Sequence, residues 1–237
     1  MAPDSGVGVF LNGIEELSKL LGLHRFSMVQ LLIALALLLF FVPFVEEIKG
    51  GDLIVAILLS LVLISAVFAV ASRRSTLIIA LVLAIPALVG RWINYFRPDL
   101  VPPAVFLTAG LALIAFVVAN LLRFVLRAPS VNADVLCASI SAYLMLGVLW
   151  TVAYWLVDQL NQEAFSFNTT TGTKETMSGS TAFYFSFITL STVGYGDITP
   201  VSKVARMLAA TEAITGLLYV AVLISRLVSL YSAPKSQ

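Results

Sequence analysis

Six long apolar runs dominate the chain and are separated by short polar segments. Each run reaches or approaches the roughly 20 residues that a helix needs to cross the hydrocarbon core of a bilayer. Pro86 interrupts the third run, but a membrane helix tolerates proline where neighbours satisfy the freed carbonyl. The pattern therefore predicts six transmembrane helices, at about Met28–Val45, Leu53–Ala71, Thr76–Ile93, Val101–Leu122, Val135–Val157 and Val204–Tyr231.

A shorter apolar and aromatic segment, Ala182–Ser191, lies between the fifth and sixth runs and ends on the hexapeptide Thr192-Val193-Gly194-Tyr195-Gly196-Asp197. Gly and Asp favour turns, so a simple turn is one interpretation of the hexapeptide. Glycine also adopts positive φ without a Cβ penalty. Two glycines that alternate with Val193 and Tyr195 therefore suit a strand whose carbonyls all face one axis, where they replace the water around a dehydrated cation.

The hexapeptide between two membrane-length helices, with Ser186–Ser191 as a pore-helix flank, resembles the selectivity filter of the tetrameric potassium-channel family. The resemblance covers about Asp134–Tyr231. It implies an all-α membrane protein with six transmembrane helices, a re-entrant pore helix and a filter loop, which assembles as a homotetramer. It also implies potassium binding at Thr192, Val193, Gly194 and Tyr195, with Gly196 completing the filter. Potassium would be the permeant ion, and no cofactor is implied.

The resemblance also implies roles for residues that flank the filter. Tyr184 and Phe185 occupy positions where many family members carry two tryptophans. We expect Tyr184 to donate a hydrogen bond to Asp197 or to stack near Tyr195, with plain interfacial packing as the alternative. Ile188 stands where some relatives carry a glutamate behind the filter, so one known route to filter inactivation should be missing.

Two residues of the last run call for a structural explanation. Glu212 lies near mid-helix, where a carboxylate costs about 2.5–3.5 kcal/mol on insertion scales. We expect it to support the filter by hydrogen bonding behind the pore helix, near Thr189 or Ser191, or else to pack in its protonated form. Gly216 is either a gating hinge or a site of close helix packing.

One face of the last run is apolar at helical spacing. By resemblance this face lines the inner cavity of the pore, which could close by dewetting. Its members are Leu217, Val220, Ile224 and Val228.

The first four runs lack the signature of a voltage sensor. Such a sensor carries several arginines in the fourth span, because one charge crossing the field yields only about 2.3 kcal/mol per 100 mV. Val101–Leu122 contains no arginine or lysine, and Arg123 and Arg127 follow only at its end. The sequence predicts weak or absent voltage dependence.

Composition agrees with a membrane protein, since 60% of the 237 residues are hydrophobic and only 11% are charged. Soluble domains are typically about 25% charged. The net charge of +1 argues against nucleic acid as a partner. One cysteine excludes an intramolecular disulfide, and a single histidine leaves no cluster for metal or acid–base chemistry. With no catalytic constellation, an enzyme is a poor hypothesis.

Charge and spacing also predict orientation and organisation. Eight basic residues fall on one side of the six spans and six on the other, which places both termini in the cytoplasm and the filter loop outside the cell membrane. Residues 1–27 read as an interfacial amphipathic segment, or as a helix docked on a neighbouring subunit, because Phe10, Ile14, Leu17 and Leu21 recur at helical spacing. Residues 28–130 then form a four-helix transmembrane domain and residues 131–237 the pore domain.

Two questions remain open at this stage. Asn168-Thr169-Thr170 matches a glycosylation sequon, a triplet that also occurs by chance. The main rival to a potassium channel is a non-conducting accessory subunit, because a complete filter indicates competence and not use. Gating must reside in the membrane, in the filter or in a separate partner.

Overall fold

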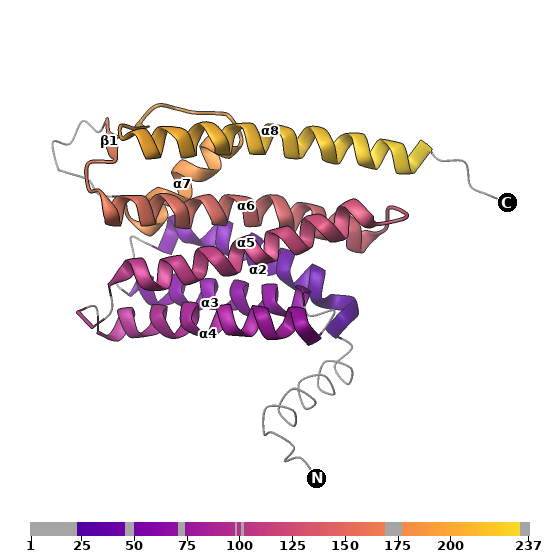
Figure 1. Cartoon of the computed structure of the whole chain (residues 1–237), viewed down its shortest axis with the longest axis horizontal. Coiled ribbons are helices and arrows are strands. Elements are labelled where there is room, and N and C mark those ends of the chain that lie inside the picture. The colour runs from indigo at the N-terminus through magenta and orange to yellow at the C-terminus, as the bar shows by residue number, and fades with distance from the viewer. Residues whose placement is uncertain are drawn as a thin grey trace, which may run out of the picture.

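The computed structural model describes residues 23–45, 50–70, 74–97, 99–100, 102–168 and 177–232. Within them, long helices run side by side as antiparallel neighbours, and a short helix is set between the last two (Figure 1). The long helices are α2 (Leu23–Val45), α3 (Gly51–Val70), α4 (Arg74–Phe96), α5 (Pro103–Arg127), α6 (Ala133–Leu160) and α8 (Lys203–Ser232). The short one is α7 (Gly179–Leu190).

Six of the described helices are long and apolar enough to cross a bilayer, which confirms the six predicted spans. The helices extend beyond most of the apolar runs, since α5 continues to Arg127 and α6 to Leu160. A helix satisfies its own backbone groups, so it need not stop where the side chains become polar. Helix α4 also continues through Pro86, the residue that interrupts the third apolar run.

Two features of the prediction lie outside the described residues. One is the amphipathic segment with Phe10, Ile14, Leu17 and Leu21, and the other is the threonine pair of the sequon after Asn168.

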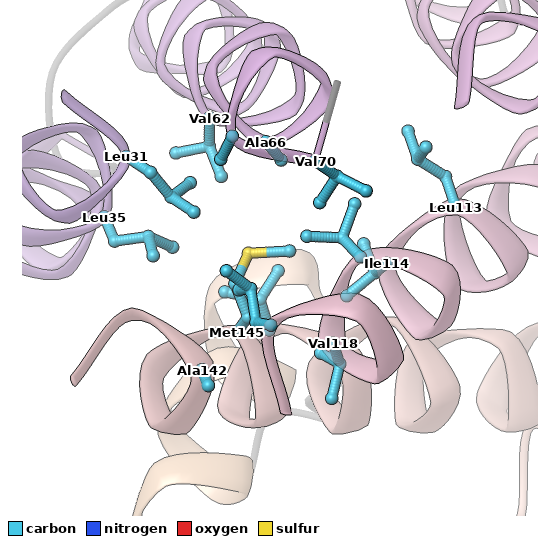
Figure 2. Close-up of a cluster of buried hydrophobic side chains, with 14 of the residues drawn as sticks. Leu31, Leu35, Val62, Ala66, Val70, Leu113, Ile114, Val118, Ala142 and Met145 are labelled. Atoms are coloured by element: carbon cyan, nitrogen blue, oxygen red, sulfur yellow. The ribbon is translucent and has the colours of Figure 1, made fainter. Parts of the chain in front are cut away.

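The four-helix unit α2–α5 packs on the outer pore helix α6 of its own chain. Helix α5 ends at Arg127, and α6 begins at Ala133, where the side chain of Asn132 accepts a hydrogen bond of 2.9 Å from the Val135 amide. Figure 2 shows residues from α2, α3, α5 and α6 meeting in one apolar cluster, among them Leu31, Val62, Ile114 and Met145. The same cluster reaches Leu190 at the end of α7, so one core supports both the four-helix unit and the pore helix.

A small antiparallel sheet joins the segments on either side of the pore helix. Strand β1 (Phe165–Phe167) pairs with β2 (Ile198–Pro200), with Ser166 opposite Thr199. Strand β1 is not among the elements that the sequence pattern predicts. The sheet holds the segment that follows the filter against a second apolar cluster, which includes Tyr154, Phe165, Phe185 and Ile198.

Candidate functional site

The hexapeptide has positive φ at every second residue. The φ angles are 60° at Thr192, 54° at Gly194 and 80° at Gly196, whereas Val193 and Tyr195 have no positive φ. When successive residues alternate between left-handed and right-handed backbone conformations, their peptide planes face the same side. In an ordinary pleated strand they do not. The glycines were expected at these angles. Thr192 was not, and a non-glycine residue there stores on the order of 1–3 kcal/mol of strain.

Hydrogen bonds to the pore helix hold the inner end of this loop. The amide of Thr192 donates to the carbonyl of Thr189 at 2.9 Å. The amides of Val193 and Gly194 both donate to the carbonyl of Ile188, at 2.9 and 3.2 Å. The last carbonyls of α7, which lack helical partners, are thus satisfied by the amides of the loop.

The carbonyl oxygens of the loop are used differently from its amides. Among the described residues, the carbonyls of Thr192, Val193, Gly194 and Tyr195 accept no hydrogen bond. Val193 and Tyr195 are also 52% and 73% exposed, although both are large apolar or aromatic residues. The loop therefore has the amides of Thr192, Val193 and Gly194 paired with the pore helix and four carbonyls free, and free carbonyls are what a bound cation requires.

The side chains of Tyr184, Asp197 and Asn168, together with nearby backbone groups, fix the outer end of the loop. The hydroxyl of Tyr184 donates to Asp197 Oδ2 at 2.8 Å, and the amide of Ile198 donates to Asp197 Oδ1 at 3.1 Å. Asn168 donates from its side chain to the carbonyl of Gly196 at 3.0 Å and from its backbone to that of Asp197 at 2.8 Å. Within the described residues Tyr184 makes no ring contact with Tyr195, so the hydrogen bond is the contact that forms.

The Tyr184 hydroxyl keeps its proton, and so remains a hydrogen-bond donor, over the physiological pH range. Burial, together with its hydrogen bond to Asp197 and the charges nearby, raises the pKa of Tyr184 to about 12. The phenol therefore stays protonated at every physiological pH. Asn168 was considered in the sequence only as a glycosylation site, and no motif marks it as a partner of Gly196. Its role arises from the β1–β2 pairing, which places it opposite the end of the loop.

Glu212 lies fully buried behind the pore helix. Its carboxyl oxygens accept hydrogen bonds from the hydroxyl of Tyr154 on α6 and from Ser186 Oγ on α7, the latter at 2.6 Å. The expectation that it bonds behind the pore helix is met, but the expected partners near Thr189 and Ser191 are wrong. Ser191 instead donates to the carbonyl of Phe187 on its own helix, at 2.6 Å. Ser186 faces Glu212 from about one turn earlier on α7.

Gly216 lies where the inner helix α8 meets the end of the pore helix. A Cβ at this position would collide with the carbonyl oxygen of Leu190, the last residue of α7. The close approach of α8 to the end of α7 therefore explains why a glycine is needed here, whether or not α8 also bends at this residue. Sequence reasoning had weighed hinge and packing equally.

The predicted cavity-lining face of α8 makes little contact with the rest of the chain. Its four residues, Leu217, Val220, Ile224 and Val228, are all exposed in the single chain. Two hydrogen bonds tie the far half of α8 to the chain: Tyr219 donates to the carbonyl of Ser139, and Arg226 donates to the carbonyl of Ala128 at 2.8 Å.

Comparison with known proteins agrees with this geometry. A family model described as "Ion channel" matches residues 141–233. The voltage-gated potassium channel Kch of Escherichia coli (strain K12) is 60% identical over 37 residues, which are 16% of this chain and 9% of the relative. Two-pore potassium channel 4 of Arabidopsis thaliana is 46% identical over 48 residues, which are 20% of this chain and 17% of the relative.

A third relative aligns over a longer stretch. Two-pore potassium channel 2 of Arabidopsis thaliana is 34% identical over 92 residues, which are 39% of this chain and 18% of the relative. The chain thus spans less than a fifth of the length of each of these relatives. No solved structure matches it. The matched segment begins within α6 and includes the filter loop with its free carbonyls, and residues 141–233 are therefore similar to ion channels, potassium channels among them.

Proposed function

We propose that four copies of this chain assemble into a potassium-selective channel that conducts passively across the cell membrane. The observation that carries the proposal is the state of the filter backbone. Its first three amides are bound to the pore helix while four successive carbonyls are free, on residues with alternating φ. One chain supplies one such row of carbonyls. Four rows around an axis complete the oxygen shell of a dehydrated potassium ion.

The surfaces left open by the single chain support a homotetramer. The filter residues Val193 and Tyr195 are exposed. So are four α8 residues that share one helix face by their spacing, Leu217, Val220, Ile224 and Val228. On an axis of four subunits, the filter face would meet potassium and the α8 face would enclose an apolar cavity. The proposal places both termini in the cytoplasm, following the distribution of lysine and arginine.

Weak or absent voltage dependence is part of this proposal. Helix α5 carries Arg123 and Arg127 only in its last two turns, and both side chains are exposed. Few charges would therefore move through the field. A steep conductance–voltage curve that is flattened when both arginines are neutralised would contradict this part. Gating then depends on the filter, on the membrane or on an unidentified partner.

The test is potassium flux in liposomes that contain the purified protein. We expect flux down a potassium gradient, blocked by barium and much smaller with sodium. Silence of a folded, reconstituted protein would favour a non-conducting accessory subunit.

A pair of glycine variants assigns the flux to the filter backbone. In both Gly194→Ala and Gly110→Ala, the added Cβ meets no atom within 4 Å. Only Gly194 has positive φ, and an L-residue there costs about 1–2 kcal/mol. We expect Gly194→Ala to lose most of the potassium flux or its selectivity, while Gly110→Ala conducts as the unaltered chain does. Equal flux through both variants would refute the assignment.

A further inference from the structure

A cavity of about 510 Å³ lies between the end of α2 and the pore helix α7. Helix α2 contributes Leu39, Val42 and Pro43, which fall within its last seven residues. Along α7 the lining runs from Ser180 in the first turn to Ile188 in the last, which is about 12 Å at 1.5 Å per residue. Small-molecule sites in proteins commonly occupy about 300–1,000 Å³, so this cavity has the size of a ligand site.

Most of the lining is apolar. Eight of the twelve described lining residues are aliphatic, aromatic or proline, and they come from α2, α7, β1 and β2. Leu39 and Pro43 are also exposed at the surface of α2. Because α2 is long and apolar enough to cross a bilayer, hydrocarbon can meet this surface. The cavity therefore suits an apolar ligand body that arrives from the membrane.

The polar part of the lining carries one charged group, Asp197. The other polar lining residues are Ser180, Thr181 and Tyr184, and no lysine or arginine is among the lining residues that the structure describes. The hydroxyls of Ser180 and Thr181 each share a hydrogen bond with Ser178, at 2.9 and 2.8 Å, and Tyr184 donates to Asp197. The carboxylate thus sets the sign of charge that a ligand should carry.

Asp197 has acceptor capacity left for such a ligand. An ionised carboxylate offers about four lone-pair sites. Two are used, by the hydroxyl of Tyr184 on Oδ2 and by the amide of Ile198 on Oδ1. The side chain is half-buried, and no cationic side chain in the described part of the chain forms an ion pair with it. A charge in apolar surroundings is costly unless it is paired, so a cation that brings N–H donors is favoured here.

We propose that this cavity binds a lipophilic ammonium compound, a protonated amine attached to an aliphatic or aromatic body. The ammonium group would donate to the free acceptor sites of Asp197, and the body would lie between Leu39 of α2 and Ile188 of α7. The ligand would contact both partners of the hydrogen bond that fixes the outer end of the filter loop, Tyr184 and Asp197. The proposal concerns binding and does not rest on ion conduction.

The experiment compares three small molecules that share one apolar body and differ in charge: phenylbutylamine, which is protonated at neutral pH, phenylbutanol and phenylbutyrate. Binding to the purified full chain in lipid nanodiscs would be measured by isothermal titration calorimetry and by thermal melting. We expect saturable binding of the amine that is about tenfold or more tighter than that of the alcohol, the ratio that one hydrogen bond to a charged group gives. The carboxylate should bind most weakly. Equal affinity for amine and alcohol would overturn the proposal.

Two variants with matched controls locate the site. Leu39→Trp should fill the cavity and weaken amine binding about tenfold or more. Leu37→Trp should not, because both leucines are 38% exposed on α2 and only Leu39 lines the cavity. Asp197→Asn should abolish the preference for amine over alcohol. Glu163→Gln should keep that preference, since it neutralises an exposed carboxylate outside the lining.

The two variants change different elements, so a folding failure in one leaves the other as a test. Equal amine affinity in the two tryptophan variants would refute the proposal. An amine held in the filter would compete with potassium, so an affinity that falls when potassium replaces sodium at constant ionic strength would also overturn it. Absence of saturable binding to the folded protein would mean that a second copy or a lipid covers the cavity, with the same consequence. None of these results bears on the flux experiments, which contain no amine.

Discussion

The hydrogen bond between Tyr154 and Glu212 should couple the outer helix to the inner helix across the pore helix. Both side chains are fully buried, and the residues lie on α6 and α8. Replacing Glu212 with leucine introduces an apolar side chain of similar size and removes both acceptors. Ser186 then still has the carbonyl of Gly147 at 2.8 Å, so it keeps a partner. Tyr154, in contrast, is left with a buried hydroxyl that has lost its hydrogen-bond partner.

The expected magnitude follows from this difference. Double-mutant cycles for hydrogen bonds in a membrane protein average about 0.6 kcal/mol, with a maximum of about 1.7 kcal/mol. We expect a coupling of about 1.5 kcal/mol, near the upper end, because neither group reaches water. Glu212→Leu should be more destabilising than Tyr154→Phe, and the double variant less so than the sum of the two.

The assay is thermal melting of the purified single and double variants under one condition. A coupling of this size corresponds to about 3–6 °C in melting temperature for a chain of this length. The melting shifts of the two single variants, converted to free energies, are added and compared with that of the double variant. Agreement within about 0.5 kcal/mol would refute the coupling, because independent sites add to that precision. Potassium flux recorded on the same samples would show whether the loss of the bond reaches the filter.

Three further predictions address the filter and its supports. Gly216→Ala should lower the melting temperature and disturb conduction, because its Cβ collides with the carbonyl of Leu190; normal flux and melting would show that α8 shifts freely. Tyr184→Phe should destabilise the conducting filter by about 1 kcal/mol, through loss of the hydrogen bond to Asp197. Because the pKa of Tyr184 is raised to about 12, this bond is kept below that pH, and single-channel open times should show no Tyr184-dependent change between pH 6 and 9. Ile188→Glu should alter inactivation of the open pore, since Ile188 lines one cavity of about 510 Å³ with Tyr184 and Asp197; unchanged kinetics would remove the idea.

The fold was predictable because its signals are long and repeated. Six apolar runs specify six helices, and the alternating glycines Gly194 and Gly196 specify a strained loop, so both appear in the structure as expected. Thr192 was missed because nothing in a threonine indicates positive φ, which is imposed here by hydrogen bonds to Thr189 and Ile188. Strand β1 was missed because three residues in a polar stretch carry too little pattern.

Contacts between distant segments were harder to predict than the elements themselves. Glu212 could be recognised as an acidic group that needs a partner, but the rotation of α7 decides that Ser186 and not Thr189 faces it. Asn168 depends on strand register, because the pairing of β1 with β2 places it beside Gly196. None of these follows from local sequence, because each is set by packing between elements far apart in the chain.

The hydrogen bond from Arg226 to Ala128 joins the end of α8 farthest from the filter to the connection between α5 and α6. Any tilt of the four-helix unit against α6 displaces that carbonyl. The C-terminal part of the inner helix must then move with that carbonyl, or the hydrogen bond breaks. Breaking it costs about 1.5–3 kcal/mol, because the donor is charged. The four-helix unit is thus linked mechanically to the end of the inner helix that lies farthest from the filter.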